Sequence, residues 1–428
     1  MSKQDKKELR QQLVCKWLEE HYIQFDRLRY DVVTDRLQIR EEKPRIAVED
    51  CRTRWRNLTD KDINTMVCQC VDEIEANISV SEMWTALKSD MVPAVHPIRA
   101  WLDQLPPYTE EQPDWIDMIA QQVVVTGGEE TNVYWRTCFK KWFVAMVASW
   151  MKDEVVNHTA LVLIGRQGIF KTTWLEHLIP PELRSYSSKL PLSGQITKDD
   201  RLRLCENAML NIDELDAICG REMNIVKSLL TSTDVNERAA YGRLKERRVR
   251  LASFCASTNN REFLTDITGN RRWLPFEVES IQNPFFTTIP YLVLYAQAKA
   301  IVESRIFSYW FDMDEIEQLE KHNEEFRAHD NEEQLLPILF DIPAEGKGEF
   351  MTTAEISERL VSHGGIKKPM NTRTLGVIMS KMGFKKAQVR ISGICVRGWY
   401  VYKREINEII AAKRVETSDA SMQRCDIY

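Results

Sequence analysis

The chain has 428 residues, a formal net charge of −6, and hydrophobic and charged shares of 43% and 29%. These values are ordinary for a folded protein and exclude a largely disordered chain. Its apolar runs fall short of the roughly 18 residues that a membrane-spanning helix needs, and its polar start lacks a secretory segment. We therefore expect a cytoplasmic protein with no membrane partner, divided into about two to four domains.

Ten cysteines are spread along the chain without a regular spacing, and several lie inside apolar runs. Such cysteines are typical of reduced, buried side chains in a cytosolic protein. Cys68 and Cys70 form a close pair, but no second pair and no histidine cluster stands nearby in the sequence. We therefore do not expect a zinc site.

The N-terminal third predicts a short mixed segment followed by helices. Residues 28–40 alternate between apolar and polar types around a Thr-Asp turn, which is typical of a hairpin. Thr59 or Asp60 is a candidate cap for a helix that runs to about residue 75. Ser79 has the spacing of a capping box and predicts the start of another helix.

A stripe of large apolar side chains follows in the next expected helix. Its members recur at helical spacing: Trp135, Phe139, Trp142, Phe143, Met146, Val147 and Trp150. Aromatic side chains can stack on nucleic-acid bases, but a stripe with this period much more often packs in a protein core. We expect this helix to be buried.

A candidate phosphate-binding loop is the strongest chemical signal in the chain. A buried-strand pattern over 160–164 leads into the loop 165–173 and then into an amphipathic helix, which is the order of a P-loop. Backbone N–H groups of such a loop cradle phosphate oxygens, while Lys171 reaches the β and γ phosphates and the Thr172 hydroxyl ligates Mg²⁺. Phe170 stands where the motif normally has glycine, and a bulky residue there restricts the loop backbone on which nucleotide affinity depends. The candidate nucleotide-binding residues are Gly165, Gly168, Lys171, Thr172 and Thr173.

Two later strands are expected to bring polar groups to the same site. The apolar strand 208–212 ends in Asp213 and Glu214, of which the first can hold Mg²⁺ and the second can polarise the attacking water. Asn259 follows the strand 253–258, and its amide can sense the γ-phosphate or position water. Each feature alone is an ordinary strand end, with Asp213 as a helix cap, but their position after a P-loop favours the catalytic interpretation.

Basic residues around the third strand are candidates for contact with nucleotide or nucleic acid. Arg271 and Arg272 lie in a turn, and either is a candidate arginine finger, a group worth about 10³–10⁵ in rate elsewhere; the alternative is two surface arginines beside a core tryptophan. The basic segment 237–250 can face a phosphate backbone, line the nucleotide site or contact another subunit. Its candidate nucleic-acid contacts are Arg243, Lys245, Arg247 and Arg248.

Residues 335–405 predict a small basic domain. Two helices, the second capped by Asn371 or Thr372, precede two alternating strands that a Ser-Gly turn joins, an arrangement typical of a winged helix. From residue 366 to 404 the chain has ten basic residues and no acidic one. This charge favours DNA over the alternative partner, another protein. The candidate DNA contacts here are Arg373, Lys381, Lys385, Lys386 and Arg390.

The four motifs within 165–272 resemble those of superfamily 3 helicases, which are AAA+-like ring ATPases of phages, viruses and plasmids. More closely, the stretches LIGRQGIFKTTWLEHLIP, NAMLNIDEL, FCASTNN and TGNRRWLPFEV are similar to the virulence-associated protein E (VapE) family of prophages and mobile elements. The upstream stretches HPIRAWLDQLP and FKKWFVAMVASW share this resemblance, which covers most of residues 25–280.

The resemblance implies an oligomeric ATPase, expected as a hexameric ring, in the replication of a mobile element. It implies ATP and Mg²⁺ as cofactors and single-stranded or forked DNA as the partner of a helicase or DNA remodeller. It also implies phosphate contacts for Gly165, Gly168, Lys171 and Thr172, metal and water roles for Asp213 and Glu214, a sensor role for Asn259 and a finger role for Arg271 or Arg272. The alternative is a nucleotide-switched DNA-binding protein, such as an initiator, repressor or defence sensor, with little turnover.

We therefore expect a multidomain protein with a helical N-terminal domain, an α/β AAA+-like P-loop NTPase core and a small C-terminal winged-helix-like domain. The expected divisions are an α+β segment (1–75), a helical domain (76–157), a P-loop NTPase domain (158–300), an acidic helical linker (301–334), a winged-helix-like basic domain (335–405) and a tail (406–428).

Overall fold

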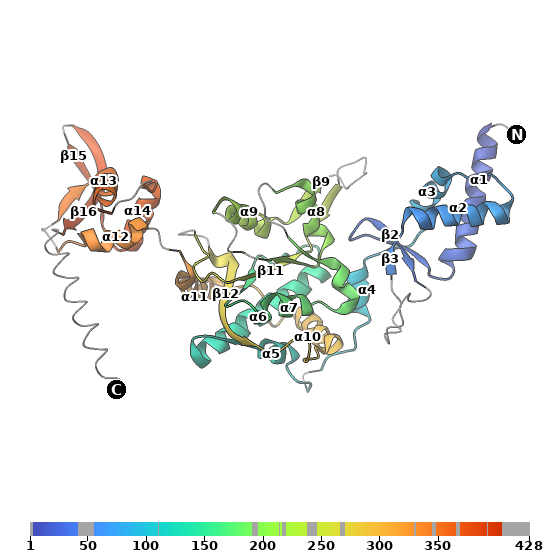
Figure 1. Cartoon of the computed structure of the whole chain (residues 1–428), viewed down its shortest axis with the longest axis horizontal. Helices are drawn as coiled ribbons and strands as arrows, with labels where there is room; N and C mark the ends of the chain where they lie inside the picture. The colour runs from blue at the N-terminus through green and yellow to red at the C-terminus, as the bar shows by residue number, and fades with distance from the viewer. Residues whose placement is uncertain are drawn as a thin grey trace. The chain divides into compact units, whose positions relative to one another are not determined.

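The computed structural model describes residues 3–41, 55–109, 111–190, 196–213, 215, 220–237, 246–265, 270–328, 331–344, 348–364, 369–391 and 393–404. These residues form helices and mixed α/β sheets, divided between two compact units (Figure 1). The first unit is Met1–Arg261 with Arg271–Asn323, and the second is Glu262–Asn270 with Glu324–Tyr428. The expected multidomain architecture with helical and α/β parts is confirmed.

The N-terminal part of the first unit packs helices against a small sheet of strand order β3-β2-β1-β4. Its elements are α1 (Lys3–Leu18), the π-helical turn η1 (Glu19–Ile23), β1 (Leu28–Asp31), β2 (Arg36–Arg40), β3 (Trp55–Asn57), α2 (Asp60–Ile74), α3 (Val80–Leu87) and β4 (Ala94–Val95). The expected hairpin is confirmed as β1 and β2, in which Leu28 pairs with Ile39. Thr59 and Ser79 both form capping boxes, at the starts of α2 and α3.

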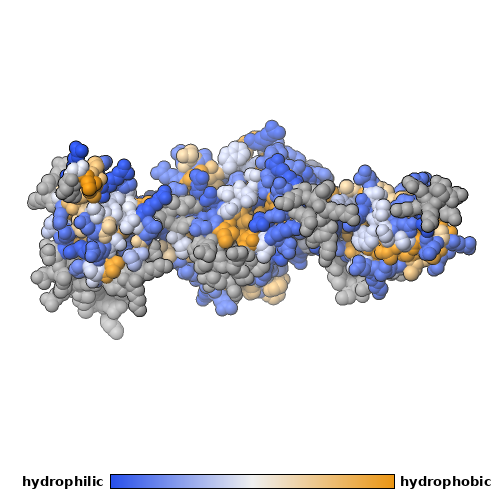
Figure 2. Space-filling view, turned by 90° about the horizontal axis from the view of Figure 1, so that it is seen from above, coloured by the Kyte–Doolittle hydropathy of each residue, from blue (hydrophilic) through white to orange (hydrophobic). Residues whose placement is uncertain are grey.

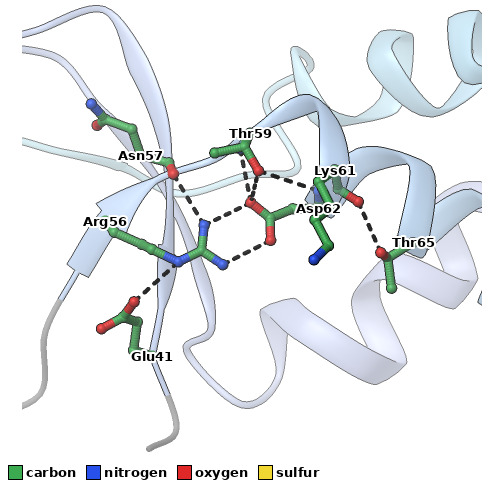
Figure 3. A network of polar contacts seen from close by, with 7 residues as sticks. All are labelled: Glu41, Arg56, Asn57, Thr59, Lys61, Asp62 and Thr65. Carbon is green, nitrogen blue, oxygen red and sulfur yellow. Dashed lines mark hydrogen bonds and ion pairs between the residues drawn. The ribbon is translucent and has the colours of Figure 1, made fainter. Parts of the chain in front are cut away.

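A polar network joins β3 to the first turn of α2 (Figure 3). The Arg56 guanidinium donates to both carboxylate oxygens of Asp62, at 2.6 and 2.7 Å, and its Nε lies 3.2 Å from Glu41 Oε1. The hydrogen bond from Arg56 lowers the pKa of Asp62 most strongly; burial opposes it, and the Thr59 hydroxyl and N–H lower the pKa further. This network fixes the start of α2 and ties it to the sheet.

Within the described residues, six strands form the main sheet of the first unit, in the order β5-β12-β6-β11-β8-β7. They are β5 (Val123–Val125), β6 (Ala160–Ile164), β7 (Ser187–Lys189), β8 (Met209–Ile212), β11 (Ser253–Thr258) and β12 (Trp273–Ile281). The strands from β12 to β7 run parallel, and β5 joins the edge antiparallel. Strands β6, β8 and β11 are buried along their whole length and are mainly apolar; the polar exceptions are Asn211, Ser253, Ser257 and Thr258. Because these three strands run parallel, their carboxyl ends meet at one edge of the sheet.

The first unit also contains several helices and helical turns. They are α4 (Pro97–Asp103), α5 (Trp115–Ala120), α6 (Gly128–Met151), α7 (Lys171–His177), the 3-10 turn η2 (Pro181–Tyr186), α8 (Lys198–Glu206), α9 (Gly220–Thr231) and α10 (Tyr291–Ser304). Figure 1 shows α5, α6 and α10 gathered beside one another, in agreement with their mutual contacts. The hairpin of β9 (Asp234–Glu237) and β10 (Glu246–Val249) stands apart from the main sheet.

The aromatic stripe of α6 is confirmed as core. Trp135, Trp142 and Trp150 are all fully buried. The Trp142 indole N–H donates to the Phe254 carbonyl at 3.0 Å, and that of Trp150 donates to the Ala208 carbonyl at 3.1 Å. Helix α6 therefore packs directly on the main sheet, and β5 pairs with β12. The region expected as a separate helical domain, 76–157, is therefore divided: α3 and β4 pack with the N-terminal helices and small sheet, whereas α6 shares the hydrophobic core of the main sheet.

The acidic helix α11 (Met313–Asn323) also packs on the first unit. Its Leu319 is fully buried, and its Glu315 lies 2.8 Å from the Nζ of Lys141, a lysine that is 6% exposed. The segment expected as a linker, 301–334, is therefore divided. Helix α11 belongs to the first unit, whereas the 3-10 turn η5 (Glu324–Phe326) and the start of α12 (Asn331–Leu339) belong to the second.

The second unit is a helical layer over a small antiparallel sheet. After α12 it contains β13 (Phe340–Asp341), β14 (Glu349–Met351), α13 (Thr353–Gly364), α14 (Thr372–Lys381), β15 (Lys386–Ile391) and β16 (Ile394–Lys403). Strand β16 pairs with β13, β14 and β15. Gly398 of β16 lies so close to the Met351 carbonyl that a Cβ atom would overlap it. Ile356, Leu375 and Val401 are fully buried beneath the helices.

Figure 2 shows the hydropathy of one face of the molecule. On this face hydrophilic residues predominate and hydrophobic ones gather in patches of limited size. In the part of the chain that the structure describes, no helix is both long and apolar enough to cross a bilayer.

Candidate nucleotide-binding site

The loop between β6 and α7 has the backbone conformation that its glycines allow. Gly165 and Gly168 have φ values of +150° and +87°, and a Cβ atom on Gly165 would lie 3.0 Å from the Val278 carbonyl oxygen. Phe170 also has a positive φ, +68°, just before the first residue of α7. A bulky residue in this left-handed region costs about 1–2 kcal/mol. Phenylalanine therefore takes the conformation that glycine adopts easily, at an energetic cost.

Lys171 is folded over this loop. Its Nζ donates to the carbonyl oxygens of Gly165 at 2.6 Å and Arg166 at 2.9 Å, and to Asn259 Oδ1 at 3.0 Å. The side chain is almost fully buried, with 7% of its surface exposed. The ammonium group is therefore held between the loop and the end of β11.

Three oxygen-bearing side chains meet beside the lysine. The Thr172 hydroxyl lies 3.3 Å from Asp213 Oδ1 and 3.0 Å from the Ser257 hydroxyl, which itself donates to Asp213 Oδ1 at 3.1 Å. Lys189 Nζ lies 2.6 Å from the other carboxylate oxygen, Oδ2. Ser257 and Lys189 were not among the residues expected at the site. Ser257 is a polar residue near the end of an apolar strand, which is a usable signal, whereas no sequence pattern marked Lys189.

Asp213 is the ionised member of this group. Burial alone would raise its pKa, but the hydrogen bond and positive charge of Lys189, together with the Ser257 and Thr172 hydroxyls, outweigh burial and lower the pKa. A carboxylate beside a hydroxyl is a hard oxygen donor set, which suits Mg²⁺ with its remaining positions filled by phosphate and water. The residues present therefore fit a magnesium ion bound together with a nucleotide.

These groups surround one cavity of about 320 Å³. Its lining consists of Gln167, Gly168, Phe170, Lys171, Thr172, Thr173, Asp213, Ser257, Thr258 and Asn259. The residues expected at the site from β6, β8 and β11 are thus brought together at the shared carboxyl edge of the sheet. Glu214 lies outside the described residues. Across the ranges that the structure describes, no cluster of three or more His, Cys, Asp or Glu side chains could hold a metal ion alone, and Cys68 and Cys70 are free thiols.

Arg271 and Arg272 lie far from this cavity along the sheet. They form the 3-10 turn η4 (Asn270–Arg272), which leads into β12. The parallel register places Trp273 beside Ala160, at the start of β6, whereas the loop leaves from the other end of that strand. At about 3.3 Å per residue, the two edges of the sheet are about 13 Å apart. Arg271 is exposed and Arg272 half-buried, and the structure does not bring them to the cavity of their own chain.

The expected nucleic-acid contacts near the β9–β10 hairpin differ in their surroundings. The Arg247 side chain is 76% exposed and lies 2.8 Å from Asp234. Arg248 is turned inward, where it lies 3.3 Å from Glu206 and donates to the Val33 carbonyl. Arg248 is therefore engaged within the protein. Arg243 and Lys245 lie outside the described residues.

The basic residues of the second unit lie mostly on its surface. Arg373 on α14, Lys385, and Lys386 and Arg390 on β15 are exposed, and Lys381 lies 3.7 Å from Glu324. Two further basic residues of the acid-free stretch are neutralised by acids from elsewhere in the unit. Lys403 lies 2.8 Å from Glu349 and Arg404 2.6 Å from Asp341. The positive surface is thus smaller than the sequence count indicates. Its exposed, described members that were expected to contact DNA are Arg373, Lys381, Lys385, Lys386 and Arg390.

Comparison with known proteins gives the family of the chain. The apo structure of the NrS-1 C-terminal region (305–718) has a TM-score of 0.47 at 11% identity and covers 89% of this chain and 97% of its own. An A-form apo structure of that region has a TM-score of 0.43 at 11% identity, covering 88% of this chain and 96% of its own. No protein with a curated functional description matches. The model of the virulence-associated protein E-like domain matches residues 109–328, more than half of the 428 residues. The chain therefore belongs to the VapE-like family.

Proposed function

We propose that this protein is an ATP-hydrolysing, DNA-binding motor, a helicase or DNA remodeller in the replication of a phage or mobile element. One observation carries the proposal: Lys171, Thr172, Asp213 and Asn259, which come from three separate stretches of sequence, surround one cavity. A lysine, a hydroxyl, an ionised carboxylate and an amide at the end of parallel strands are the groups that phosphoryl transfer requires.

Each residue has a role in this proposal. The N–H groups of the loop would hold phosphate oxygens, and the Lys171 ammonium would exchange its loop carbonyls for the β and γ phosphates. The Thr172 hydroxyl and Asp213 would hold Mg²⁺, which neutralises charge on the phosphates when bound. Asn259 would contact the γ-phosphate through its amide. Glu214, the next residue after Asp213, would orient and deprotonate the attacking water.

The place of the arginines supports action on a neighbouring subunit. Arg271 and Arg272 lie at the edge of the sheet opposite to the cavity, about 13 Å away by strand rise, so their own cavity is out of reach of a finger. A head-to-tail ring would bring that edge to the cavity of the next chain. We therefore propose a homo-oligomer, with a hexameric ring as the form that the family resemblance implies.

The second unit is the proposed DNA-binding module. Two helices followed by a hairpin, with exposed Arg373 on α14 and Lys386 and Arg390 on β15, are typical of a winged helix on DNA. The β9–β10 hairpin, with exposed Arg247, is a second candidate for the phosphate backbone.

The test is ATP turnover by the full chain with Mg²⁺, with and without single-stranded DNA. A motor should hydrolyse ATP faster when DNA is present. Tight ATP binding with turnover that DNA leaves unchanged would instead support the alternative, a nucleotide-switched initiator, repressor or defence sensor. The left-handed Phe170 in the loop is the observation that favours this alternative, because a strained loop can hold nucleotide without positioning it for cleavage.

A further inference from the structure

An aromatic cluster lies beside the phosphate cavity. Phe170, which lines the cavity, meets Phe285 edge to face, with ring centroids 6.4 Å apart and an interplanar angle of 80°. Phe285 also meets the His177 imidazole edge to face, at 5.8 Å and 84°. Three rings thus come together from three segments of the first unit: the loop, the last residue of α7, and the turn after β12.

Phe285 is held in an exposed position. Phenylalanine is usually buried, yet 69% of the Phe285 surface is exposed. Asn283 orders the turn that carries it: the Phe285 N–H donates to Asn283 Oδ1, and the Phe286 N–H and the Thr287 hydroxyl donate to the Asn283 carbonyl, each at 3.0 Å. These hydrogen bonds hold the turn, and with it the exposed Phe285 ring, in place beside the cavity.

The position of His177 links this cluster to the nucleotide. His177 lies one helical turn after Thr173, and its Nδ1 is 2.7 Å from the Thr173 carbonyl oxygen. Thr173 lines the phosphate cavity. Lys171 would take the terminal phosphates, so the nucleoside end of the ligand has to leave the cavity elsewhere. The side on which Phe170, His177 and Phe285 meet offers it an apolar, aromatic surface.

We infer that Phe285, supported by Phe170 and His177, is the platform on which the base of a bound nucleoside triphosphate stacks. This inference rests on the proposed function, because it takes phosphate binding in the cavity as given. It also explains why phenylalanine occupies the loop position where glycine is normal: the Phe170 ring is needed to support Phe285. Every base has a π-face, so a stacking platform favours purines over pyrimidines by ring area and distinguishes ATP from GTP weakly.

The experiment is calorimetric titration of the full chain with three probes in Mg²⁺. The probes are adenosine 5′-(β,γ-imido)triphosphate, its cytidine equivalent and inorganic tripolyphosphate. Wild-type protein should bind the adenosine compound most tightly and tripolyphosphate least. Phe285→Ala should weaken the adenosine compound about 5- to 150-fold while leaving tripolyphosphate unchanged, and Phe285→Tyr should retain tight binding. The matched control is Phe25→Ala, which removes another exposed phenylalanine of the same unit, 59% exposed.

Several results would overturn the inference. If wild type and Phe285→Ala bind the adenosine compound equally tightly, Phe285 is not the stacking platform, although phosphate binding in the cavity still stands. If wild type binds tripolyphosphate as tightly as the adenosine compound, the base adds nothing to the affinity and no platform is present. If Phe285→Ala changes only the sedimentation coefficient, Phe285 is a contact between subunits instead. If wild type binds none of the three probes, the proposed function itself fails, which is a different outcome from the others.

Discussion

The nucleotide cavity and the basic surface of the second unit are built in opposite ways. In the cavity, Lys171 is 7% exposed and Asp213 accepts hydrogen bonds from three neighbouring side chains, so each group depends on the others. On the second unit, residues such as Arg373 and Arg390 are exposed, and charge rather than mutual contact unites them. Coupled groups lose function together when one is removed, whereas separate surface charges contribute additively. Single substitutions should therefore have large effects in the cavity and small, additive effects on the second unit.

The largest effect is expected for the arginines that the structure separates from their own cavity. The double variant Arg271→Ala/Arg272→Ala should lose about 10³-fold or more in turnover, and Lys171→Ala should lose at least about 10²-fold. In a random 1:1 mixture roughly a quarter of the interfaces would join an intact loop to an intact finger. Turnover should therefore return in mixtures that cross-linking shows to co-assemble.

This mixing test would contradict the action of the arginines on a neighbouring subunit if no activity returned. Failure of recovery in co-assembled mixtures, with full specific activity of wild type at high dilution, would mean that the arginines act within one chain or only stabilise the turn before β12.

The next largest effect is expected for Glu214, the candidate group that activates water. Glu214→Gln should slow ATP cleavage about 10²- to 10⁴-fold, because it removes only the group that deprotonates water. ATP affinity should stay within a few-fold of wild type. Single-turnover hydrolysis and equilibrium binding measure the two quantities, and Glu130→Gln, an exposed glutamate in the first turn of α6, is the matched control. Loss of ATP binding in Glu214→Gln would make the residue structural.

A smaller and graded effect is expected on the second unit. Each of Lys385→Ala, Lys386→Ala and Arg390→Ala should lower DNA affinity modestly, and the triple variant should reduce the slope of log affinity against log salt by about 2 to 3, at roughly 0.9 per lost duplex phosphate contact. Substitution is preferable to truncation, because the second unit also includes Glu262–Asn270. An unchanged slope would direct attention to the β9–β10 hairpin or to a protein partner.

The smallest effect lies outside both regions, in the network of Arg56 and Asp62. Arg56→Ala should lower the free energy of unfolding by about 1 kcal/mol or less, since the pair is partly exposed. The pKa of Asp62 is lowered in the folded state, so its contribution is present above its unfolded pKa of about 3.9 and is lost as pH falls through the folded value. Urea denaturation of wild type and variant should therefore differ at pH 7 and converge in strong acid. A difference that grows on acidification would contradict the assignment.

The sequence allowed several residues that line the cavity to be placed at one edge of the sheet. A buried strand followed by polar residues marks the carboxyl edge of a parallel sheet, which is how Lys171, Asp213 and Asn259 could be placed together without a structure. Lys189 could not be found this way, since β7 is short and its pairing with β8 depends on contacts between distant residues. Phe285 could not be predicted either, because the exposure of a phenylalanine side chain is seen only in the structure.

Domain limits were harder to predict for a related reason. Helix α6 has the periodicity of a helix in any helical domain, and only its tertiary contacts, such as that of Trp142 with Phe254, assign it to the main sheet. The acidic face of α11 resembled a solvated linker, yet Leu319 and the buried Lys141 hold it to the first unit. The charge count of the acid-free stretch overestimates the positive surface. Lys403 and Arg404 are neutralised by Glu349 and Asp341, which precede this stretch in the sequence.

The central claim is that the cavity around Lys171 hydrolyses ATP. Its most direct test is the steady-state rate of phosphate release from Mg²⁺-ATP by wild type, Lys171→Ala and the control Lys61→Ala, an exposed lysine on α2, at equal concentration and with single-stranded DNA. We expect turnover by wild type and Lys61→Ala and a loss of at least about 10²-fold in Lys171→Ala, because the charge that stabilises the transferring phosphoryl group is gone. Equal rates for wild type and Lys171→Ala would contradict this claim.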